Sequence, residues 1–519
     1  MDSNTLQILI AMVIYMAAVI GIGLVYAKRA NKNSEAYFLG GRSLGPWVTA
    51  MSAEASDMSG WLLMGLPGVA YWFGLADAFW TALGLAVGTY LNWLFVSKRL
   101  RRYSVRANNS ITLPEFFSNR FRENKKTIML LSAAFILIFF TAYASSCFVT
   151  CGKLFSALFG TDYVSMMILG AVFVLAYTLL GGFLAESASD FMQAIVMIVA
   201  LTVIVTLGTV NAGGFGQVIA NAKEIPGFLE FFGLATPTLD AAGTQIVENG
   251  KPLFGAASDY GWLTVCSMMA WGLGYFGMPQ VLLRFMAIRK EDKLKRSRRI
   301  AMVWVGISLA VAVFIGIVGR QVFPTAHLTK SAAENIFITM ATSYLPPIIA
   351  GFVMAGILAA TISSSDSYLL IAASAFAKNI FQGICKKNAT EKQVMWVSRL
   401  TLLVLALIGV VLALDEKSII FEIVSFAWAG FGATFGPLML FSLFWKRVNK
   451  PGAIAGMVSG AAMVFLWKLV ISKLGGVFAI YELLPAFILS SLCIVVVSLL
   501  TKAPSQEIQE DFEAVKAGK

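Results

Sequence analysis

The stretch that decides the fold is Ser52–Pro67, which reads SAEASDMSGWLLMGLP. It belongs to an apolar segment long enough to cross a membrane, yet it carries two acids, Glu54 and Asp57, and three serines. A second stretch, Trp271–Pro279, reads WGLGYFGMP and holds three glycines and a proline. Backbone that leaves a regular helix at membrane depth is tolerated only where it lines a cavity. Both stretches therefore predict interrupted helices around a central binding site.

The composition of the whole chain agrees with a membrane protein. Of its 519 residues, 58% are hydrophobic and 13% are charged, and the mean hydropathy is +0.78. A soluble globular protein carries about 25% charged residues. The sequence therefore predicts an all-α polytopic membrane protein. We interpret the net charge of +12 as basic loops at one membrane face, and we expect no nucleic-acid partner.

Residue counts exclude several kinds of chemistry. The chain has five cysteines. Their number is odd and most of them lie in apolar stretches, so no disulfide framework is indicated. Its single histidine, His327, excludes a His-pair metal site and leaves little for a Ser-His-Asp triad. No nucleotide-binding P-loop of the form G-x-x-x-x-G-K-[ST] occurs. We therefore expect no enzyme activity, and we expect an ion gradient to be the energy source.

Thirteen apolar stretches of about 20 residues predict transmembrane helices. The N-terminus lacks the positive segment of a cleaved signal peptide, so the first span is expected to be retained. The predicted spans lie at approximately 6–27, 44–68, 73–98, 126–154, 163–181, 188–210, 259–280, 300–322, 346–378, 395–414, 421–445, 452–473 and 478–501.

The distribution of basic residues predicts the orientation. Lysines and arginines follow the odd-numbered spans, from Lys28-Arg29 to Lys446-Arg447, whereas the long loop 211–258 holds only two lysines. Because cytoplasmic loops carry the excess of positive charge, the N-terminus is predicted to lie outside. The acidic tail Glu507–Glu513 is then cytoplasmic. Helical spans predict a bacterial inner membrane rather than an outer-membrane barrel.

The two interrupted stretches fall in spans 2 and 7, five spans apart. This spacing predicts a five-plus-five inverted-repeat core with broken helices. The expected parts are an extra N-terminal helix and first cytoplasmic loop at 1–43, the first repeat at 44–210, an extracytoplasmic loop at 211–258, the second repeat at 259–445, and two peripheral helices with a cytoplasmic tail at 446–519.

Polar side chains inside two spans indicate cation binding. A charge at the position of Asp57 costs a few kcal/mol, so it should face a cavity or a cation; a helix-capping role is the compatible alternative. The ninth span contains ATISSSDS at 360–367. Hydroxyl and freed carbonyl oxygens suit Na⁺, although single serines more often bond their own helix backbone.

Other candidates are more ambiguous. Asp190 lies near the start of the sixth span, where exposure at the membrane interface is an equal alternative to a functional role. Tyr143, Trp271 and Tyr275 lie beside broken or serine-rich backbone. They fit the walls of a site for a small, partly apolar solute, and ordinary packing is the alternative.

Four motifs resemble the sodium:solute symporter family. They are Leu39–Pro46 (LGGRSLGP), Ala55–Gly68 (ASDMSGWLLMGLPG), Trp271–Gly277 (WGLGYFG) and the signature GGFLA at 181–185 with Asp190 and Gln193. The resemblance runs over nearly the whole chain, and the first two motifs resemble the branch that carries proline. It implies a five-plus-five fold with an extra N-terminal helix, and sodium-coupled uptake of L-proline by alternating access.

The resemblance also implies roles for particular residues. The Na⁺ site would consist of the backbone carbonyls of Ala55, Met58 and Ala360 with the hydroxyls of Ser363 and Ser364. Asp57 would be the acid needed for sodium coupling. An unwound helix offers N–H groups to an amino-acid carboxylate, and aromatic faces suit a ring with a cationic nitrogen. Proline would accordingly lie near a set formed by Ser59, Gly60 and Trp61, opposite Tyr143, Trp271, Tyr275 and Pro279.

Three acids, Glu54, Glu186 and Asp366, depart from the family pattern. Our hypothesis is that Asp190, Ser363, Asp366 and Ser367 form a second cation or proton site. Glu54 is a further candidate, either for proton coupling or as a neutral carboxyl hydrogen-bonded in the break. Coupling to H⁺ or Li⁺, or transport of another small amino acid or organic solute, is therefore the alternative.

Two other classes of membrane protein, sensors and ion channels, are less favoured. A transporter-derived sensor lacks support because no signalling domain is appended. An ion channel lacks an obvious pore-lining ring. Besides L-proline, Na⁺ and the lipid bilayer, no obligatory protein partner is expected.

Overall fold

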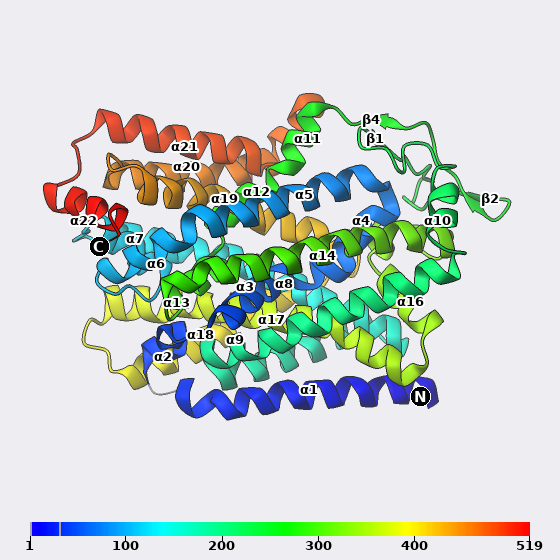
Figure 1. Ribbon diagram of the computed structural model, residues 1–519, viewed down its shortest axis with the longest axis horizontal. Coiled ribbons are helices and arrows are strands. Elements are labelled where there is room, and N and C mark those ends of the chain that lie inside the picture. The colour runs from blue at the N-terminus through cyan, green and yellow to red at the C-terminus, as the bar shows by residue number, and fades with distance from the viewer. Residues whose placement is uncertain (1–2, 31–32, 519) are drawn as a thin grey trace.

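Helices running along the long axis make up most of the molecule (Figure 1). The computed structural model describes residues 3–30 and 33–518. Within these residues, ten helices are long and apolar enough to cross a membrane, and a shorter apolar helix covers Tyr163–Leu179. The N-terminus and the C-terminus lie at opposite ends of the long axis (Figure 1). The chain is therefore a multi-pass membrane protein.

The second predicted span is interrupted where its sequence predicts. The long helix α1 (Ser3–Ala30) corresponds to the first predicted span. Two short elements, α2 (Ser34–Leu39) and η1 (Gly40–Arg42), then lead into α3 (Pro46–Gly60), where the second span begins. Ser59 has φ 45° and ψ −170°, which ends regular helix. A π-helical turn, η2 (Trp61–Gly65), and α4 (Leu66–Phe73) follow.

The third span extends beyond its predicted end at residue 98. From α5 (Leu75–Leu91) the chain continues through η3 (Asn92–Val96) into α6 (Ser97–Arg106). Leu100 and Tyr103 are buried on one side of α6, so this basic segment is amphipathic and stays helical. Next come α7 (Leu113–Arg120) and α8 (Thr127–Phe159).

Predicted spans 5 and 6 both lie in α9 (Tyr163–Asn211), which is divided at Gly182. Gly182 has φ 61° and ψ 177°, and a Cβ there would lie 2.7 Å from the Tyr37 ring. Only glycine fits this position, because the left-handed backbone and the close ring both exclude a side chain.

The loop 211–258 is not purely irregular, and it adds a little β-structure to the expected all-α fold. It contains α10 (Phe215–Ala222) and two antiparallel pairs of very short strands. These pairs are β1 (Gly233–Leu234) with β4 (Ser258–Asp259), and β2 (Val247–Glu248) with β3 (Lys251–Pro252).

The seventh span is also interrupted. It comprises α11 (Trp262–Met269), α12 (Trp271–Gly274), η4 (Tyr275–Gly277) and α13 (Pro279–Ala287). Met278 between the last two elements is extended, with φ −77° and ψ 109°. Proline at the first position of α13 fits a helix start, because its missing N–H has no intrahelical partner there.

The rest of the chain is again helical. Its elements are η5 (Glu291–Lys293), α14 (Leu294–Val322), α15 (Lys330–Ala333), α16 (Ile336–Tyr344), α17 (Pro347–Ser374), η6 (Ala375–Cys385), α18 (Glu391–Leu412), α19 (Ile420–Phe444), α20 (Lys450–Leu469), η7 (Ile471–Leu474), η8 (Gly476–Phe478), α21 (Leu483–Leu500) and α22 (Gln506–Lys516).

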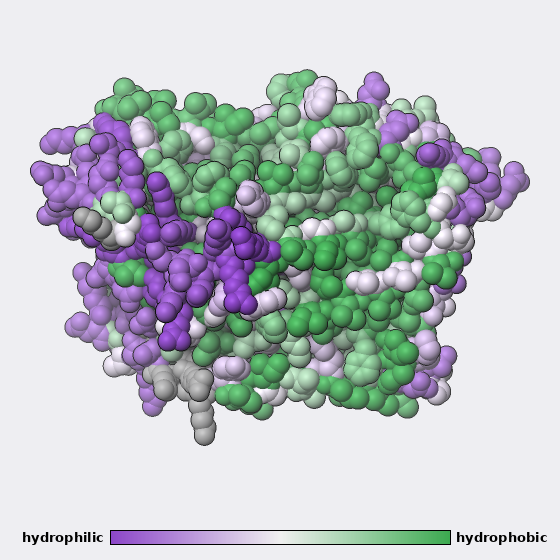
Figure 2. Space-filling view, viewed as in Figure 1, coloured by the Kyte–Doolittle hydropathy of each residue, from purple (hydrophilic) through white to green (hydrophobic). Residues whose placement is uncertain are grey.

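Burial separates a core from a periphery. In α17 and α19, 83% of the most apolar 18 residues are buried, against 28% in α20 and 33% in α1 and α21. Figure 2 shows a broad hydrophobic surface with hydrophilic residues gathered toward the two ends of the long axis. The buried α17 therefore lies at the centre of the bundle, where it faces the break in α3.

Candidate ion and solute site

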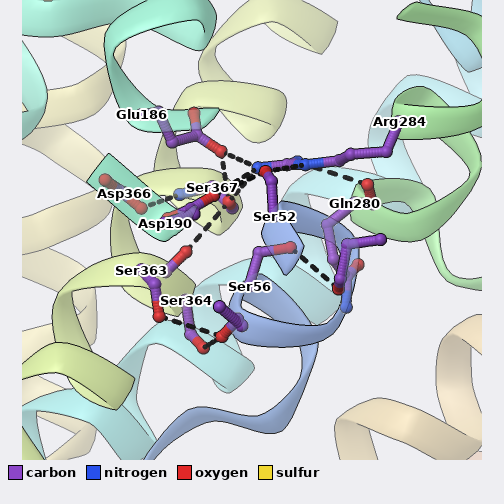
Figure 3. A network of polar contacts seen from close by, with 12 residues as sticks. Ser52, Ser56, Glu186, Asp190, Gln280, Arg284, Ser363, Ser364, Asp366 and Ser367 are labelled. Atoms are coloured by element: carbon purple, nitrogen blue, oxygen red, sulfur yellow. Dashed lines mark hydrogen bonds and ion pairs between the residues drawn. The ribbon is translucent and has the colours of Figure 1, made fainter. Parts of the chain in front are cut away.

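Four of the five predicted Na⁺ ligands converge between α3 and α17. The Ser363 hydroxyl lies 2.9 Å from the Ala55 carbonyl and 3.2 Å from the Ala360 carbonyl, and the Ser364 hydroxyl lies 3.4 Å from the Ala55 carbonyl. All are buried, and Figure 3 shows both serines in this part of the polar network. The Met58 carbonyl instead accepts the Trp61 N–H within the break.

The predicted Na⁺ ligands are neutral hydroxyl and carbonyl oxygens and not carboxylates. Within the part of the chain that the structure describes, no group of three or more His, Cys, Asp or Glu side chains is arranged to hold a metal ion. Hydroxyl and carbonyl oxygens are suitable ligands for a hard monovalent cation. The oxygen set is therefore chemically suited to Na⁺.

Asp57 joins the two interrupted spans. Its carboxylate accepts a hydrogen bond from the Tyr275 hydroxyl at 2.8 Å and another from the Gln280 side chain at 3.1 Å. The Asp57 carbonyl lies 3.3 Å from the Tyr143 hydroxyl and 3.4 Å from that of Tyr368. Asp57 is 3% exposed. It therefore faces the other broken helix and not the lipid.

Aromatic rings lie beside the interruptions of the second and seventh spans. The Trp271 ring centroid lies 5.5 Å from that of Trp61 and 5.3 Å from that of Phe421. Tyr275 meets Trp428 edge-on at 5.0 Å, and Tyr143 stacks on Tyr368 at 4.2 Å. Of the other predicted solute residues, Ser59 and Gly60 lie at the break itself and Pro279 begins α13. These rings and the open backbone are suitable walls for a small solute with an apolar ring.

A buried ion pair between Lys153 and Glu334 lies beside the aromatic residue Phe421. Glu334, in the segment between α15 and α16, accepts the backbone N–H groups of Ile420 and Phe421 at 3.0 Å. Its carboxylate also pairs with Lys153 of α8 at 2.6 Å. Both side chains are nearly fully buried. This loop is therefore fixed to α8 and to the start of α19.

The most highly charged part of the core is a cluster around Arg284 (Figure 3). The Arg284 guanidinium pairs with Glu186, and it lies 3.2 Å from Asp190 and 2.8 Å from the Ser367 hydroxyl. Ser52 of α3 donates to Asp190 at 2.7 Å. Asp190 is 0% exposed, so the alternative of exposure at the membrane interface is wrong; the residue faces α3 and α13 rather than headgroups.

Asp366 and Glu54 differ in their position relative to the Arg284 cluster. One Asp366 oxygen accepts the Ser367 N–H at 2.7 Å, and the other has no partner among the described residues. Glu54 does not join the cluster, because its carboxylate faces η3, where it accepts from the Trp93 indole at 3.0 Å. The structure therefore brings Asp190, Ser363 and Ser367 together with Asp366 and leaves Glu54 apart.

Sequence reasoning missed two central residues, Gln280 and Arg284. The seventh span was predicted from its apolar stretch to end at residue 280, so Gln280 was its last residue and Arg284 fell outside it. The spacing i, i+4 places them on one face of α13, and that spacing was the available signal. The aromatic residues Tyr368, Phe421 and Trp428 had no such signal, because nothing distinguishes them from packing residues.

Comparison with known proteins identifies the family of this chain. A model of the sodium:solute symporter family matches residues 37–460. The high-affinity proline transporter PutP of Bacillus subtilis is 41% identical over 488 residues, which are 94% of this chain and 97% of that protein. The sodium/proline symporter of Haemophilus influenzae is 42% identical over 514 residues, covering 97% of each chain.

A solved structure of a Na⁺-coupled sialic acid symporter, in a substrate-bound outward-open state, has the same fold. Its TM-score is 0.73 at 19% identity, and the match covers 96% of this chain and 99% of that one. The family model covers well over half of the chain, and the relatives match it nearly end to end. This chain belongs to the sodium:solute symporter family.

Proposed function

We propose that the protein takes up L-proline by secondary active transport coupled to Na⁺, with alternating access to a central site. The observation that carries this proposal is the convergence of the Ala55 and Ala360 carbonyls with the Ser363 and Ser364 hydroxyls at the break in α3. Two relatives of high identity are named as proline transporters. An inward Na⁺ gradient then drives uptake, and the membrane potential adds about 2.3 kcal/mol per charge per 100 mV.

The proposed proline site lies beside this cation site. The carboxylate would lie at the break beside Ser59, Gly60 and Trp61, where the Trp61 N–H already donates to carbonyls of the break. Tyr143, Trp271, Tyr275 and Pro279 would enclose the ring. Asp57 would couple the two ligands, because it lies between the Na⁺ ligands of α3 and Tyr275 of η4. Another cation or another small solute is the alternative to Na⁺ and proline.

We further assign the Arg284 cluster as a second cation or proton site. Glu186, Asp190 and Asp366 are each at most 3% exposed. If all three were ionised, Arg284 would leave two negative charges uncompensated in the membrane core, which is very costly. A bound proton or cation removes this cost, and the free oxygen of Asp366 is its proposed position. If Asp366→Asn leaves the Na⁺ affinity, the coupling ratio and the pH dependence of uptake unchanged, this assignment is wrong.

For topology we propose thirteen spans in a five-plus-five inverted repeat, with residues 44–210 and 259–445 as the two repeats. The N-terminus would be outside and the C-terminus in the cytoplasm of the bacterial inner membrane. The ten long helices, the helix at 163–179 and the two interrupted spans add up to this number. The opposite positions of the termini in Figure 1 support an odd number of spans.

The deciding experiment is uptake of radiolabelled L-proline into proteoliposomes under an inward Na⁺ gradient or an inward H⁺ gradient. We expect accumulation with Na⁺ only, and we expect Asp57→Ala to abolish it. Accumulation with H⁺ alone would refute sodium coupling. Failure of both gradients to accumulate proline would refute the proposed solute.

A further inference from the structure

An apolar groove on the outer surface of the bundle has a basic end. The groove has a volume of about 460 Å³ and lies between the beginning of α3, the second half of α9 and the first half of α14. Ile195 and Val199 of α9 and Val303 and Ile307 of α14 line it, and Val303 is 64% exposed. Such a surface faces acyl chains in a membrane.

Positive charge distinguishes this groove from other apolar grooves on the same surface. Arg299 belongs to its lining. Arg296, one helical turn earlier, places its guanidinium carbon 5.9 Å from the centre of the Trp47 ring, which also lines the groove. In contrast, the described linings of two further grooves, of about 590 Å³ beside α18 and about 300 Å³ between α5 and α14, contain no charged side chain.

Neither arginine is neutralised by the protein. Both are exposed, and none of the ion pairs in the described chain includes Arg296 or Arg299. Arg42, in contrast, is satisfied by the protein, because protein oxygens accept its hydrogen bonds at 2.6 to 3.1 Å. Each guanidinium can therefore offer several donors to an external anion.

The walls of the groove are fixed relative to one another. The Ser297 hydroxyl donates to the Pro46 carbonyl at 2.9 Å, which joins the beginnings of α14 and α3. The Trp304 indole donates to the Ala194 carbonyl at 3.0 Å, which joins α14 to α9. Figure 2 shows hydrophilic residues where α14 begins and a hydrophobic surface along the helix beyond.

We propose that this groove binds one anionic phospholipid from the cytoplasmic leaflet. Its phosphate would lie between Arg296 and Arg299, and an acyl chain would follow Val303 and Ile307. The eight steps from Arg299 to Ile307 rise about 12 Å along the helix, which matches the part of an acyl chain nearest the headgroup. Basic pockets between helices at the cytoplasmic interface favour anionic headgroups, and Trp47 is suited to the same interface.

The lipid would touch a functional element. Trp47 and Met51 of the groove belong to α3, the helix that also carries Ala55 and Asp57. The proposal uses the membrane orientation proposed above, but it does not depend on which solute is carried.

The test is lipid binding by the full-length protein, delipidated in detergent and titrated with phosphatidylglycerol or phosphatidylcholine under native mass spectrometry. We expect Arg296→Gln/Arg299→Gln to weaken binding of one phosphatidylglycerol about 30-fold, as for two basic residues at a membrane surface, and to leave phosphatidylcholine unchanged. The matched control is Lys386→Gln/Lys387→Gln, which removes the same charge from exposed positions elsewhere.

A second variant tests the groove separately from the charge. Val303→Trp should fill the groove and weaken phosphatidylglycerol binding while both arginines remain, and millimolar inorganic phosphate should not compete. Equal loss in the arginine variant and the lysine control would refute the site in favour of unspecific attraction. Unchanged binding in the arginine variant, or competition by phosphate alone, would equally overturn the proposal.

Discussion

At the residue scale, the role of a buried serine in α17 depends on what faces it. Ser363 reaches the carbonyl of Ala55 on α3 at 2.9 Å. Ser365, two positions later, donates to carbonyls of its own helix, at 2.6 Å to Thr361 and at 3.4 Å to Ile362. Both side chains are 0% exposed. Burial alone therefore does not distinguish the two serines, whereas the contact with the broken helix α3 does, and it is the reason why Ser363 is the proposed ligand.

This contrast predicts different effects of two serine substitutions. Ser363→Ala removes a proposed Na⁺ ligand, and we expect the Na⁺ concentration for half-maximal proline uptake to rise on the order of tenfold to a hundredfold, as for hydrogen bonds to charged groups. Ser365→Ala should change this concentration by less than about twofold. Proteoliposome uptake as a function of Na⁺ measures both, and equal effects of the two variants would contradict the assignment.

At the scale of elements, the break in α3 depends on close packing against α8. A Cβ at Gly60 would lie 2.5 Å from the Thr150 hydroxyl oxygen. Glycine at this point lets the two helices approach, and the adjacent Ser59 takes the unusual backbone conformation. The interrupted helix is thus stabilised by a neighbouring helix and not by local sequence alone.

We expect Gly60→Ala to destabilise the protein by about 1–3 kcal/mol, as for overpacking in a core, and to reduce uptake. Thr150→Ala removes the two atoms nearest the new methyl group, so the double variant should recover part of the stability. Thermal unfolding in detergent and proline uptake are the measurements.

Gly21→Ala serves as the control for this pair, because a Cβ there meets nothing within 4 Å. It should leave both readouts unchanged. If the Gly60→Ala variant were as stable as the unsubstituted protein, α3 and α8 could move apart without loss of stability, which would contradict the prediction.

At the scale of the whole molecule, the C-terminal helix α22 joins α6 to the segment after α7 at one end of the bundle. In α22, Asp511 pairs with Arg106 of α6 and with Arg122, each at 2.8 Å, and Glu507 pairs with Arg122 at 2.6 Å. Phe512 and Val515 are buried on the other side of α22. The helix is therefore fixed both by apolar contacts and by ion pairs that salt can screen.

These ion pairs predict a pH dependence. Partial burial raises the pKa of Asp511, but its hydrogen bonds to Arg122 and Arg106 outweigh this effect and the pKa is lowered. The contribution of Asp511 to docking is therefore fully present above its ordinary pKa near 4 and is lost as the pH falls below that value.

We expect a spin label at Lys516→Cys to become more mobile below about pH 4, and also in 1 M salt at neutral pH. Asp511→Asn should show the higher mobility already at neutral pH. A label that stays immobile under all three conditions would show that the apolar contacts alone hold the helix.

The sequence by itself determined the membrane class and the positions at which two helices are interrupted. Hydropathy predicted the membrane class, and glycine, proline and acids inside apolar runs predicted the interruptions at Ser59 and near Met278. These signals are local, because a membrane helix cannot hide polar or broken backbone from lipid. The serines of α17 were predicted as cation ligands for another local reason, because several hydroxyl oxygens stand together in one apolar span.

Only the tertiary structure decided which polar groups meet. Arg284 lies beyond the predicted end of its span, yet it pairs with Glu186 and Asp190 from α9, and Gln280 bonds Asp57 across the two breaks. Glu54 shares a helix with Asp57 but turns to Trp93. Such pairings depend on the relative rotation and depth of helices far apart in the chain. That arrangement is set by packing over the whole bundle, and no local pattern encodes it.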